Sequence, residues 1–240
     1  MAEKKKKNSL SKVQSDFVNL TSHQLRTPLS GIKWLLELLQ KSDTGNLNKK
    51  QKDFIEKINS SNERMIALVN DLLEVSRIEQ GQTKLYLQAT DLTDIVQSMV
   101  KEKEKEIKKK KLQVSFTIEQ EPFPLVRTEP NKIKQAVNNL ISNAIAFTPD
   151  GGRIAVNLGR DGEFALVSIA DTGVGIPKEQ QSQIFNRFFR GTNVLTLETT
   201  GTGLGLFISK IFIEASGGRI WFKSEENKGT TFYFTLPVAK

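Results

Sequence analysis

Apolar residues in the first third of the chain recur at alternating steps of three and four positions, the spacing of one helix face. One row continues through residues of several kinds at these steps: Leu10, Val13, Phe17, Leu20, Gln24, Thr27, Gly31, Trp34 and Leu38. A second, wholly apolar row lies beside it: Leu25, Leu29, Ile32, Leu36 and Leu39. These rows predict a long helix that ends near Lys41, because residues 42–46 are turn and cap residues. The same steps predict a second helix over Phe54, Ile58, Ser61, Met65, Leu68, Leu72 and Val75.

The two apolar rows are wider than the seam of a two-stranded coil, so each helix is expected to contact more than one neighbour. A single helical hairpin would leave much of this surface exposed to water. Pairing two antiparallel hairpins into a four-helix bundle covers it, and we therefore predict a homodimer. The hairpin is expected over residues 9–80, after a basic tail at residues 1–8.

The periodicity changes after about Thr83, where short segments of alternating apolar and polar residues begin. Strands are predicted over Lys84–Leu87, Leu112–Ile118, Arg153–Leu158, Phe164–Ala170, Arg219–Lys223 and Thr231–Leu236, and helices over Leu92–Lys110, Asn131–Phe147, Lys178–Phe185 and Leu204–Ala215. Asp161-Gly162, between two strands, predicts a tight hairpin. Mostly antiparallel strands with helices on one face make an α+β two-layer sandwich over residues 85–240, joined to the hairpin by a linker at residues 81–84.

Charge and composition exclude several classes of protein. The net charge of +8 comes largely from Lys4–Lys7 and Lys108–Lys111, and no aromatic residues alternate with these lysines as a base-stacking surface requires. We therefore expect no nucleic-acid partner. The 240 residues include no cysteine, no apolar stretch long enough for a transmembrane helix and no signal-peptide pattern, so a cytoplasmic protein without disulfides is expected.

The single histidine, His23, lies in the first predicted helix, one position before the seam residue Gln24. Pro28 follows five residues later and removes the hydrogen bond to the carbonyl of Gln24, so a bend is expected beside the histidine. A neutral, accessible imidazole at the edge of a bundle is a competent nucleophile toward phosphorus. A lone histidine is more often structural than catalytic, so this position taken alone only suggests a catalytic role.

Two glycine-rich segments have the composition of phosphate-binding loops. Residues 171–177 (Asp-Thr-Gly-Val-Gly-Ile-Pro) follow a predicted strand, and residues 201–206 (Gly-Thr-Gly-Leu-Gly-Leu) open a predicted helix. Glycines let backbone amides approach an anion, and a helix N-terminus presents unpaired N–H groups. The second segment resembles a dinucleotide fingerprint in spacing, but that motif requires a strand directly before it, and Thr192–Thr200 has no strand pattern.

Asn139 and Asn143 lie four residues apart in the helix predicted over Asn131–Phe147 and therefore share one of its faces. Amide oxygens suit a hard cation such as Mg²⁺ that bridges phosphates. Read by itself, the pair is also compatible with a solvated polar stripe.

Taken in order, these segments resemble the sequence boxes of the histidine kinase family. Ser22–Leu29 resembles the phosphoacceptor box, Asn139–Thr148 the asparagine box, Asp171–Pro177 and Gly201–Leu206 the two glycine boxes, and Ile184–Arg190 the phenylalanine box. The resemblance extends from about residue 9 to residue 238. It implies a dimerisation and histidine-phosphotransfer hairpin followed by an ATP-binding domain of the type shared with gyrase and heat-shock chaperones.

The resemblance also implies a role for each matching residue. ATP would phosphorylate His23, which would pass the phosphoryl group to an aspartate of a response-regulator receiver domain. Asp171 would accept a hydrogen bond from the adenine amino group, Asn143 would ligate Mg²⁺, and Asn139 would lie beside the phosphates. Thr27 matches the position that orients water for dephosphorylating the partner. Further nucleotide contacts are expected from Gly173, Gly175, Gly201, Gly203, Leu204, Gly205, Arg187 and Arg190, the arginines at the γ-phosphate, with Thr192–Thr200 as a lid.

Two departures from the family pattern concern the rate of phosphorylation. Gln24 stands where a carboxylate commonly takes the imidazole proton, and an amide can only hold and orient the ring. Ala146 stands where a lysine is common, which removes a cation near the phosphates. These departures favour an alternative, a nucleotide-binding phosphotransfer scaffold with weakened kinase activity. A gyrase- or chaperone-like ATPase is a third class, and His23 on a dimer helix argues against it.

Overall fold

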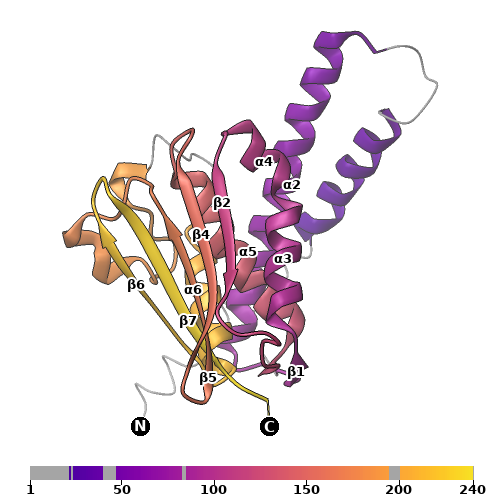
Figure 1. Ribbon diagram of the computed structural model, residues 1–240. Helices are drawn as coiled ribbons and strands as arrows, with labels where there is room; N and C mark the ends of the chain where they lie inside the picture. Colours follow the sequence, from indigo (N-terminus) through magenta and orange to yellow (C-terminus); the bar gives the residue numbers. More distant parts are fainter. Residues whose placement is uncertain (1–21, 23, 40–46, 83–84, 195–200, 240) are drawn as a thin grey trace. The chain divides into compact units, whose positions relative to one another are not determined.

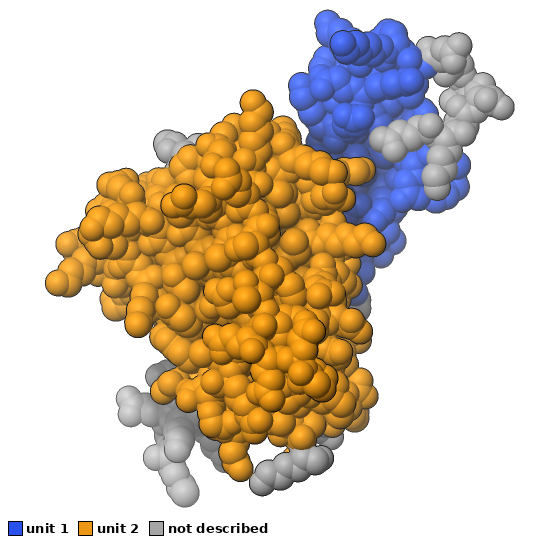
Figure 2. Space-filling view, viewed as in Figure 1, with its two compact units in different colours: residues 1–84 blue, residues 85–240 orange. Residues whose placement is uncertain are grey.

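The chain divides into two compact units in the computed structural model, residues 1–84 and residues 85–240 (Figure 2). The structure describes residues 22, 24–39, 47–82, 85–194 and 201–239. Over these ranges the first unit contains helices and no strand, whereas the second combines two sheets with several helices.

The first unit contains a helix over residues 24–39 and α2 over Lys49–Glu79 (Figure 1). A reciprocal cap begins α2: the side chain of Asn48 accepts a hydrogen bond from the backbone N–H of Gln51, and the side chain of Gln51 accepts one from the backbone N–H of Asn48. The expected end of the first helix near Lys41 lies outside the described residues.

The two helices are antiparallel, because contacts join early residues of one with late residues of the other. Arg26 donates a hydrogen bond to Asn70 (2.7 Å), and Lys33 forms an ion pair with Glu63 (2.7 Å). A small buried cluster accompanies these pairs and consists of Leu29, Val69 and Leu73. The predicted antiparallel hairpin is therefore confirmed.

The second unit is built on a five-stranded sheet with the order β2-β4-β5-β7-β6 (Figure 1). Its strands are β2 (Gln113–Ile118), β4 (Arg153–Asp161), β5 (Phe164–Asp171), β6 (Arg219–Glu225) and β7 (Gly229–Pro237). β2 and β4 are parallel and all other neighbours are antiparallel. The tight hairpin predicted at Asp161-Gly162 joins β4 to β5, with Gly162 at a φ of 59°.

The major helices lie on one face of this sheet. They are α3 (Leu92–Glu102), α5 (Pro130–Phe147) and α6 (Gly205–Ala215); α5 packs on α6 and β5, α6 on β6, and α3 on α5. Every second residue of the central strands is buried in the same core as these helices, among them Val156, Val167 and Phe234. Burial with a period of two on a single face defines the predicted α+β two-layer sandwich.

The shortest elements differ from the sequence prediction. The strand predicted over Lys84–Leu87 is wrong for residues 85–87, which form no strand, and Lys84 lies outside the described residues. The strand β1 is instead Gln88–Thr90 and pairs with β3 (Val126–Thr128), a strand absent from the prediction. The helix predicted over Leu92–Lys110 is interrupted at Lys103, which separates α3 from α4 (Glu104–Lys109). Lys178–Gln183 forms a 3-10 helix, η1, in place of the predicted α-helix. Elements of three to six residues are too short for periodicity to define.

Candidate functional site

Asp171 ends β5 and continues the face of that strand on which Val167 and Ile169 are buried. Its Oδ1 atom accepts two backbone hydrogen bonds, from Gly173 at 2.8 Å and from Thr230 at 3.2 Å. Its Oδ2 atom accepts none from the residues that the structure describes. One oxygen is thus fixed by the backbone, and the other remains an acceptor for a ligand N–H group.

The environment of Asp171 also changes its acidity. Burial raises the pKa of the Asp171 carboxyl to about 6, and the hydrogen bonds from Gly173 and Thr230 oppose this rise by favouring the carboxylate. At neutral pH the group is therefore mostly an acceptor-only carboxylate. A largely buried acidic group with a perturbed pKa is a candidate for ligand recognition.

Two glycines let the loop after Asp171 pass close to its surroundings. A Cβ atom on Gly173 would lie 2.6 Å from both the carbonyl oxygen of Phe147 and Oδ1 of Asp171. Gly175 has a φ of +65°, and a Cβ atom there would overlap the carbonyl oxygen of Glu225. Both positions therefore require glycine, and the loop is held against α5 on one side and the β6–β7 hairpin on the other.

Ser224 holds this loop from a distant part of the sequence. Its hydroxyl accepts a hydrogen bond from the backbone N–H of Ile176 (2.9 Å) and donates to the carbonyl of Gly229 (3.0 Å). The side-chain amide of Gln181 donates to the carbonyls of both Ile176 and Ser224, at 3.1 Å each. Sequence reasoning missed Ser224 and Gln181, because neither lies in a recognisable motif and their contacts appear only on folding.

The two asparagines of α5 have different surroundings. Asn139 donates to the carbonyl of Gly205 (3.1 Å) and to the hydroxyl of Ser209 (3.3 Å), so it ties α5 to the first turn of α6. Asn143 is half-buried, and its side chain makes no hydrogen bond within the described parts of the chain. Its amide oxygen is thus available to a cation.

The second glycine segment leads into α6, which begins at Gly205. Leu204 is buried and provides no side-chain cap, so the first N–H groups of α6 are not capped by that side chain. Gly203 has a φ of +71°, and a Cβ atom there would lie 2.6 Å from the backbone of Phe188. The segment thus brings an uncapped helix N-terminus, which attracts anions, close to the phenylalanine box.

The two arginines of the phenylalanine box point to different places. The guanidinium of Arg187 lies over the ring of Phe207, 5.2 Å from its centre. Arg190 is half-buried beside Gly201, since a Cβ atom added there would lie 3.8 Å from Arg190 Nε. Of the two, Arg190 is the one that lies at the second glycine segment.

Two hydrogen bonds join Thr192, at the start of the expected lid, to Gln180 in η1. Gln180 donates from its amide to the hydroxyl of Thr192 (2.6 Å) and accepts a hydrogen bond from the backbone N–H of Thr192 (3.0 Å). Thr192–Val194 forms a 3-10 turn, η2. The rest of the expected lid, residues 195–200, lies outside the described residues.

His23, the expected phosphoacceptor, also lies outside the described residues. Gln24 and Thr27 follow it on the first helix, and both are exposed. One residue after Pro28, the carbonyl of Leu29 accepts a hydrogen bond from the buried side-chain amide of Asn62 (2.9 Å), which fixes α2 to this helix. Unit 1 therefore offers two exposed polar side chains, Gln24 and Thr27, one and four positions after His23.

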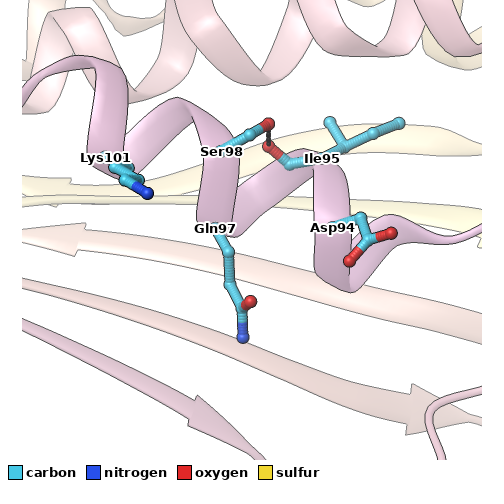
Figure 3. Close-up of a pocket in the computed structure, with 5 residues that line it drawn as sticks. All are labelled: Asp94, Ile95, Gln97, Ser98 and Lys101. Atoms are coloured by element: carbon cyan, nitrogen blue, oxygen red, sulfur yellow. Dashed lines mark hydrogen bonds between the residues drawn. The ribbon is translucent and has the colours of Figure 1, made fainter.

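A shallow hollow on α3 is a poor candidate for a site. Asp94, Ile95, Gln97, Ser98 and Lys101 line it, and Figure 3 shows that all five come from this one helix and that Gln97 points away from Ser98. The only hydrogen bond drawn there joins Ser98 to the carbonyl of Ile95.

The described ranges also hold no cluster of three histidine, cysteine or acidic residues for a metal. No helix within them is long and apolar enough to span a membrane.

Comparison with known families gives matches in both units. Residues 13–81 match the model described as His Kinase A (phospho-acceptor) domain, and residues 128–240 match the model described as histidine kinase-, DNA gyrase B-, and HSP90-like ATPase. The sensor histidine kinase WalK of Bacillus subtilis is 36% identical over 225 residues, which are 92% of this chain and 36% of that protein.

Solved structures give the same result. Full-length ShkA in complex with AMPPNP has a TM-score of 0.75 at 26% identity and covers 94% of this chain and 46% of that one. The histidine kinase ThkA, solved in complex with the response regulator protein TrrA, has a TM-score of 0.65 at 24% identity, with 99% and 66% covered, and supports the fold alone.

Fold and site together define a phosphoacceptor-type helical hairpin joined to an ATPase-type nucleotide-binding domain. The chain belongs to the histidine kinase family and comprises the catalytic core of a sensor histidine kinase. It spans between 25% and 37% of the length of the curated relatives that it matches.

Proposed function

We propose that this chain binds ATP at Asp171, phosphorylates its own His23 and transfers the phosphoryl group to an aspartate of a response regulator. The observation that carries the proposal is the carboxylate of Asp171, fixed through Oδ1 by two backbone N–H groups with Oδ2 left open. An open oxygen of this kind is complementary to the amino group of adenine and mispaired with the carbonyl oxygen of guanine, which favours ATP over GTP.

The remaining nucleotide contacts follow from the same geometry. Gly173 and Gly175 allow close approach of the base, while the glycines of residues 201–205 and the N-terminus of α6 suit the phosphates. Arg190, beside Gly201, would reach the γ-phosphate. Arg187 would have to leave Phe207 to do so, and we therefore assign it a secondary role.

Asn143 would hold Mg²⁺. Its half-buried amide makes no hydrogen bond within the described ranges, and a single amide oxygen together with phosphate oxygens and water is a typical donor set for this ion. Bound there, Mg²⁺ would supply charge neutralisation for the phosphates. Asn139 would act indirectly, since its amide is used to hold α6.

The transfer itself is an in-line displacement that depends on alignment and charge neutralisation. An imidazole nitrogen of His23 attacks the γ-phosphorus, a nitrogen–phosphorus bond forms, and the bond to the leaving oxygen of ADP breaks. The proton of the attacking imidazole passes to water. Exposed Gln24 would accept a hydrogen bond from the imidazole and fix its tautomer without removing the proton.

Phosphohistidine is a good donor to a carboxylate, which makes an aspartate of a receiver domain the expected acceptor. The match of residues 13–81 to the His Kinase A (phospho-acceptor) model supports a phosphotransfer role of this kind. Thr27 is exposed on the helix four positions after His23, where its hydroxyl would orient water to dephosphorylate that partner.

A homodimer would cover the apolar surface that the hairpin leaves exposed. Trp34 is 60% exposed and Leu35 54% exposed on the first helix, while Phe54 and Ile58 of α2 are each 50% exposed. Large apolar side chains gathered in this way mark an interaction surface. A second hairpin of the same sequence, completing a four-helix bundle, is the partner that we propose.

Incubating the full chain with γ-labelled ATP and Mg²⁺ tests the proposal. The label is expected to be stable to alkali, labile to acid and absent from His23→Ala, as a phosphoramidate on that histidine would be. Acid-stable label, or label that survives the substitution, would overturn the assignment. Nucleotide binding without any label would instead favour the scaffold suggested by Gln24 and Ala146.

A further inference from the structure

Lys110, in the turn between α4 and β2, reaches the end of α5. Its ammonium group donates hydrogen bonds to the carbonyl of Ile145 (2.8 Å) and to the carbonyl of Ala146 (2.9 Å). The last four carbonyls of a helix have no partners within the helix, and α5 has no basic residue of its own in its last turn. Lys110 thus supplies the donors and the positive charge that favour this helix end.

The other two terminal carbonyls of α5 are bonded as well. The carbonyl of Ala144 accepts hydrogen bonds from the backbone N–H and the hydroxyl of Thr148. The carbonyl of Phe147 accepts one from the backbone N–H of Val174 (3.2 Å). Since Val174 belongs to the loop that begins at Asp171, the capped end of α5 is bonded directly to the nucleotide site.

Contact at Gly173 makes this connection tight. The N–H of Gly173 donates to Oδ1 of Asp171 (2.8 Å), and a Cβ atom on Gly173 would lie 2.6 Å from the carbonyl oxygen of Phe147. No free space separates the last turn of α5 from the backbone that fixes the carboxylate. A shift of this turn must therefore move Asp171 or break its hydrogen bonds.

The backbone around Lys110 fixes the point from which its side chain reaches α5. Its carbonyl accepts a hydrogen bond from the N–H of Gly151 (2.8 Å), and the next residues continue the contact, with the N–H of Gln113 donating to the carbonyl of Gly152 (2.9 Å). Lys111 has a φ of 53°, which closes the turn. The segment after α5 is thus held on the same side as its terminal carbonyls.

We propose that Lys110 is a positioning residue of the nucleotide site, which holds the last turn of α5 and, through Phe147 and Val174, the loop that places Asp171. This inference rests on the proposed function, in which the adenine of ATP binds at Asp171. A competing role for the same lysine is direct contact with the phosphates, as a replacement for the lysine that the family commonly has at position 146. If Lys110 only positions the site, its loss weakens the binding of every adenine nucleotide equally. If it contacts the phosphates, its loss weakens the binding of ATP more than that of ADP.

The test compares Lys110→Met, Lys110→Arg and Lys109→Met in the full chain. Lys109→Met is the matched control, because it removes an exposed neighbouring charge whose side chain makes no hydrogen bond or ion pair with the described residues of α5. Dissociation constants and stoichiometries for ATP and ADP are measured by calorimetry, and KM and kcat by autophosphorylation. Lys110→Met is expected to weaken ATP and ADP by the same factor, about threefold to tenfold, with full stoichiometry and kcat within about twofold. Lys110→Arg, which keeps the donors and the charge, and the control should bind as the parent does.

Three results would overturn the inference. They are unchanged affinity in a folded Lys110→Met chain, reduced stoichiometry with unchanged affinity, and weakened ATP with unchanged ADP. Should Lys110→Met fail to fold, Lys110→Gln, which keeps N–H donors but removes the charge, is judged by the same criteria. Asp171→Asn separates this inference from the proposed function: if it too leaves ATP affinity unchanged, the adenine binds elsewhere and the proposed function fails.

Discussion

The backbone N–H of Thr230 donates a hydrogen bond to Oδ1 of Asp171 over 3.2 Å, although the two residues are 59 positions apart in the sequence. Gly229 makes this approach possible, because a Cβ atom at that position would overlap the carbonyl oxygen of Asp171. The carboxylate therefore depends on the β6–β7 hairpin as much as on the strand that carries it. The hairpin forms part of the proposed nucleotide site without containing any of the family's sequence boxes.

Asp171→Asn should weaken ATP binding by roughly tenfold or more. The substitution keeps the shape of the side chain but places an amide N–H group where an acceptor must face the adenine amino group, and a mispaired buried polar group costs about 1–3 kcal/mol. Calorimetry on the parent, Asp171→Asn and the exposed control Asp161→Asn measures the effect. Equal affinity in all three proteins would place the adenine elsewhere.

The acidity of Asp171 predicts a pH dependence of stability in the nucleotide-free protein. Burial raises the pKa of its carboxyl to about 6 from an ordinary value of 3.8, so the folded state binds the proton more tightly than the unfolded chain does. This contribution to stability is present in full below the unfolded pKa and is lost as the pH rises through the folded pKa, by on the order of 3 kcal/mol.

Asp171→Asn isolates that contribution, because every other titrating group is common to both proteins. The free energy of unfolding of the parent, minus that of Asp171→Asn, should fall as the pH is raised from about 4.5 to about 7.5. Urea unfolding at several pH values measures the difference. A flat or rising difference would show that the carboxyl is not buried in the nucleotide-free protein.

Sequence patterns predicted the long elements because many residues repeat one signal. α2 and α5 follow the apolar periodicity, and the buried positions of β4, β5 and β7 alternate as expected. β1 and β3, with three residues each, contain too few positions to alternate, and the 3-10 helix η1 has no distinct periodicity.

The residues of the candidate site fall into the same two groups, those that a sequence pattern predicts and those that it does not. Asp171 and the glycines are recognisable because a close backbone approach permits few residue types at each position. Ser224 accepts a hydrogen bond from Ile176, which is 48 positions away in the sequence, and Lys110 donates one to Ile145, which is 35 positions away. Contacts between residues so far apart leave no local sequence pattern. Only the folded chain reveals such contacts.

Ser224→Ala should weaken ATP binding by about threefold to tenfold, since the hydroxyl that accepts the N–H of Ile176 would be lost and a hydrogen bond of this kind contributes about 1 kcal/mol. Ser61→Ala, at an exposed position of α2, is the matched control. Calorimetry with ADP as well as ATP should give equal losses, because the proposed site places this loop at the base and not at the γ-phosphate. A loss confined to ATP would contradict this placement.

The homodimer predicts a molecular mass twice that of the 27.0 kDa chain in light scattering. Ile58→Lys introduces a charge on the exposed apolar surface of α2 and should shift the protein toward monomer at micromolar concentration, because a buried unpaired charge is costly. Tyr86→Lys changes an even more exposed residue of the other unit and should leave the dimer intact. A parent chain that is monomeric at these concentrations would contradict the bundle.

Gln24 gives the sharpest test of the chemical step. The residue is exposed on the helix directly after His23, and an amide there can orient an imidazole but cannot take its proton. A positioned general base typically contributes about 10²- to 10⁴-fold in rate. Gln24→Glu supplies such a base in nearly the same shape and should accelerate autophosphorylation measurably, because proton removal would no longer depend on water.

Gln24→Met completes the comparison, since it keeps the length of the side chain, supplies no base and removes the hydrogen-bond acceptor of the amide. The initial rate at saturating ATP should therefore rank Glu above Gln above Met at position 24, with equal ATP affinity in all three proteins because the residue lies on the hairpin and not in the nucleotide site. A Gln24→Glu rate equal to or below that of the parent would show that proton transfer does not limit the reaction. Closure of the ATP-binding unit onto the hairpin would then be the slow step, and a rate that falls with solvent viscosity would identify it.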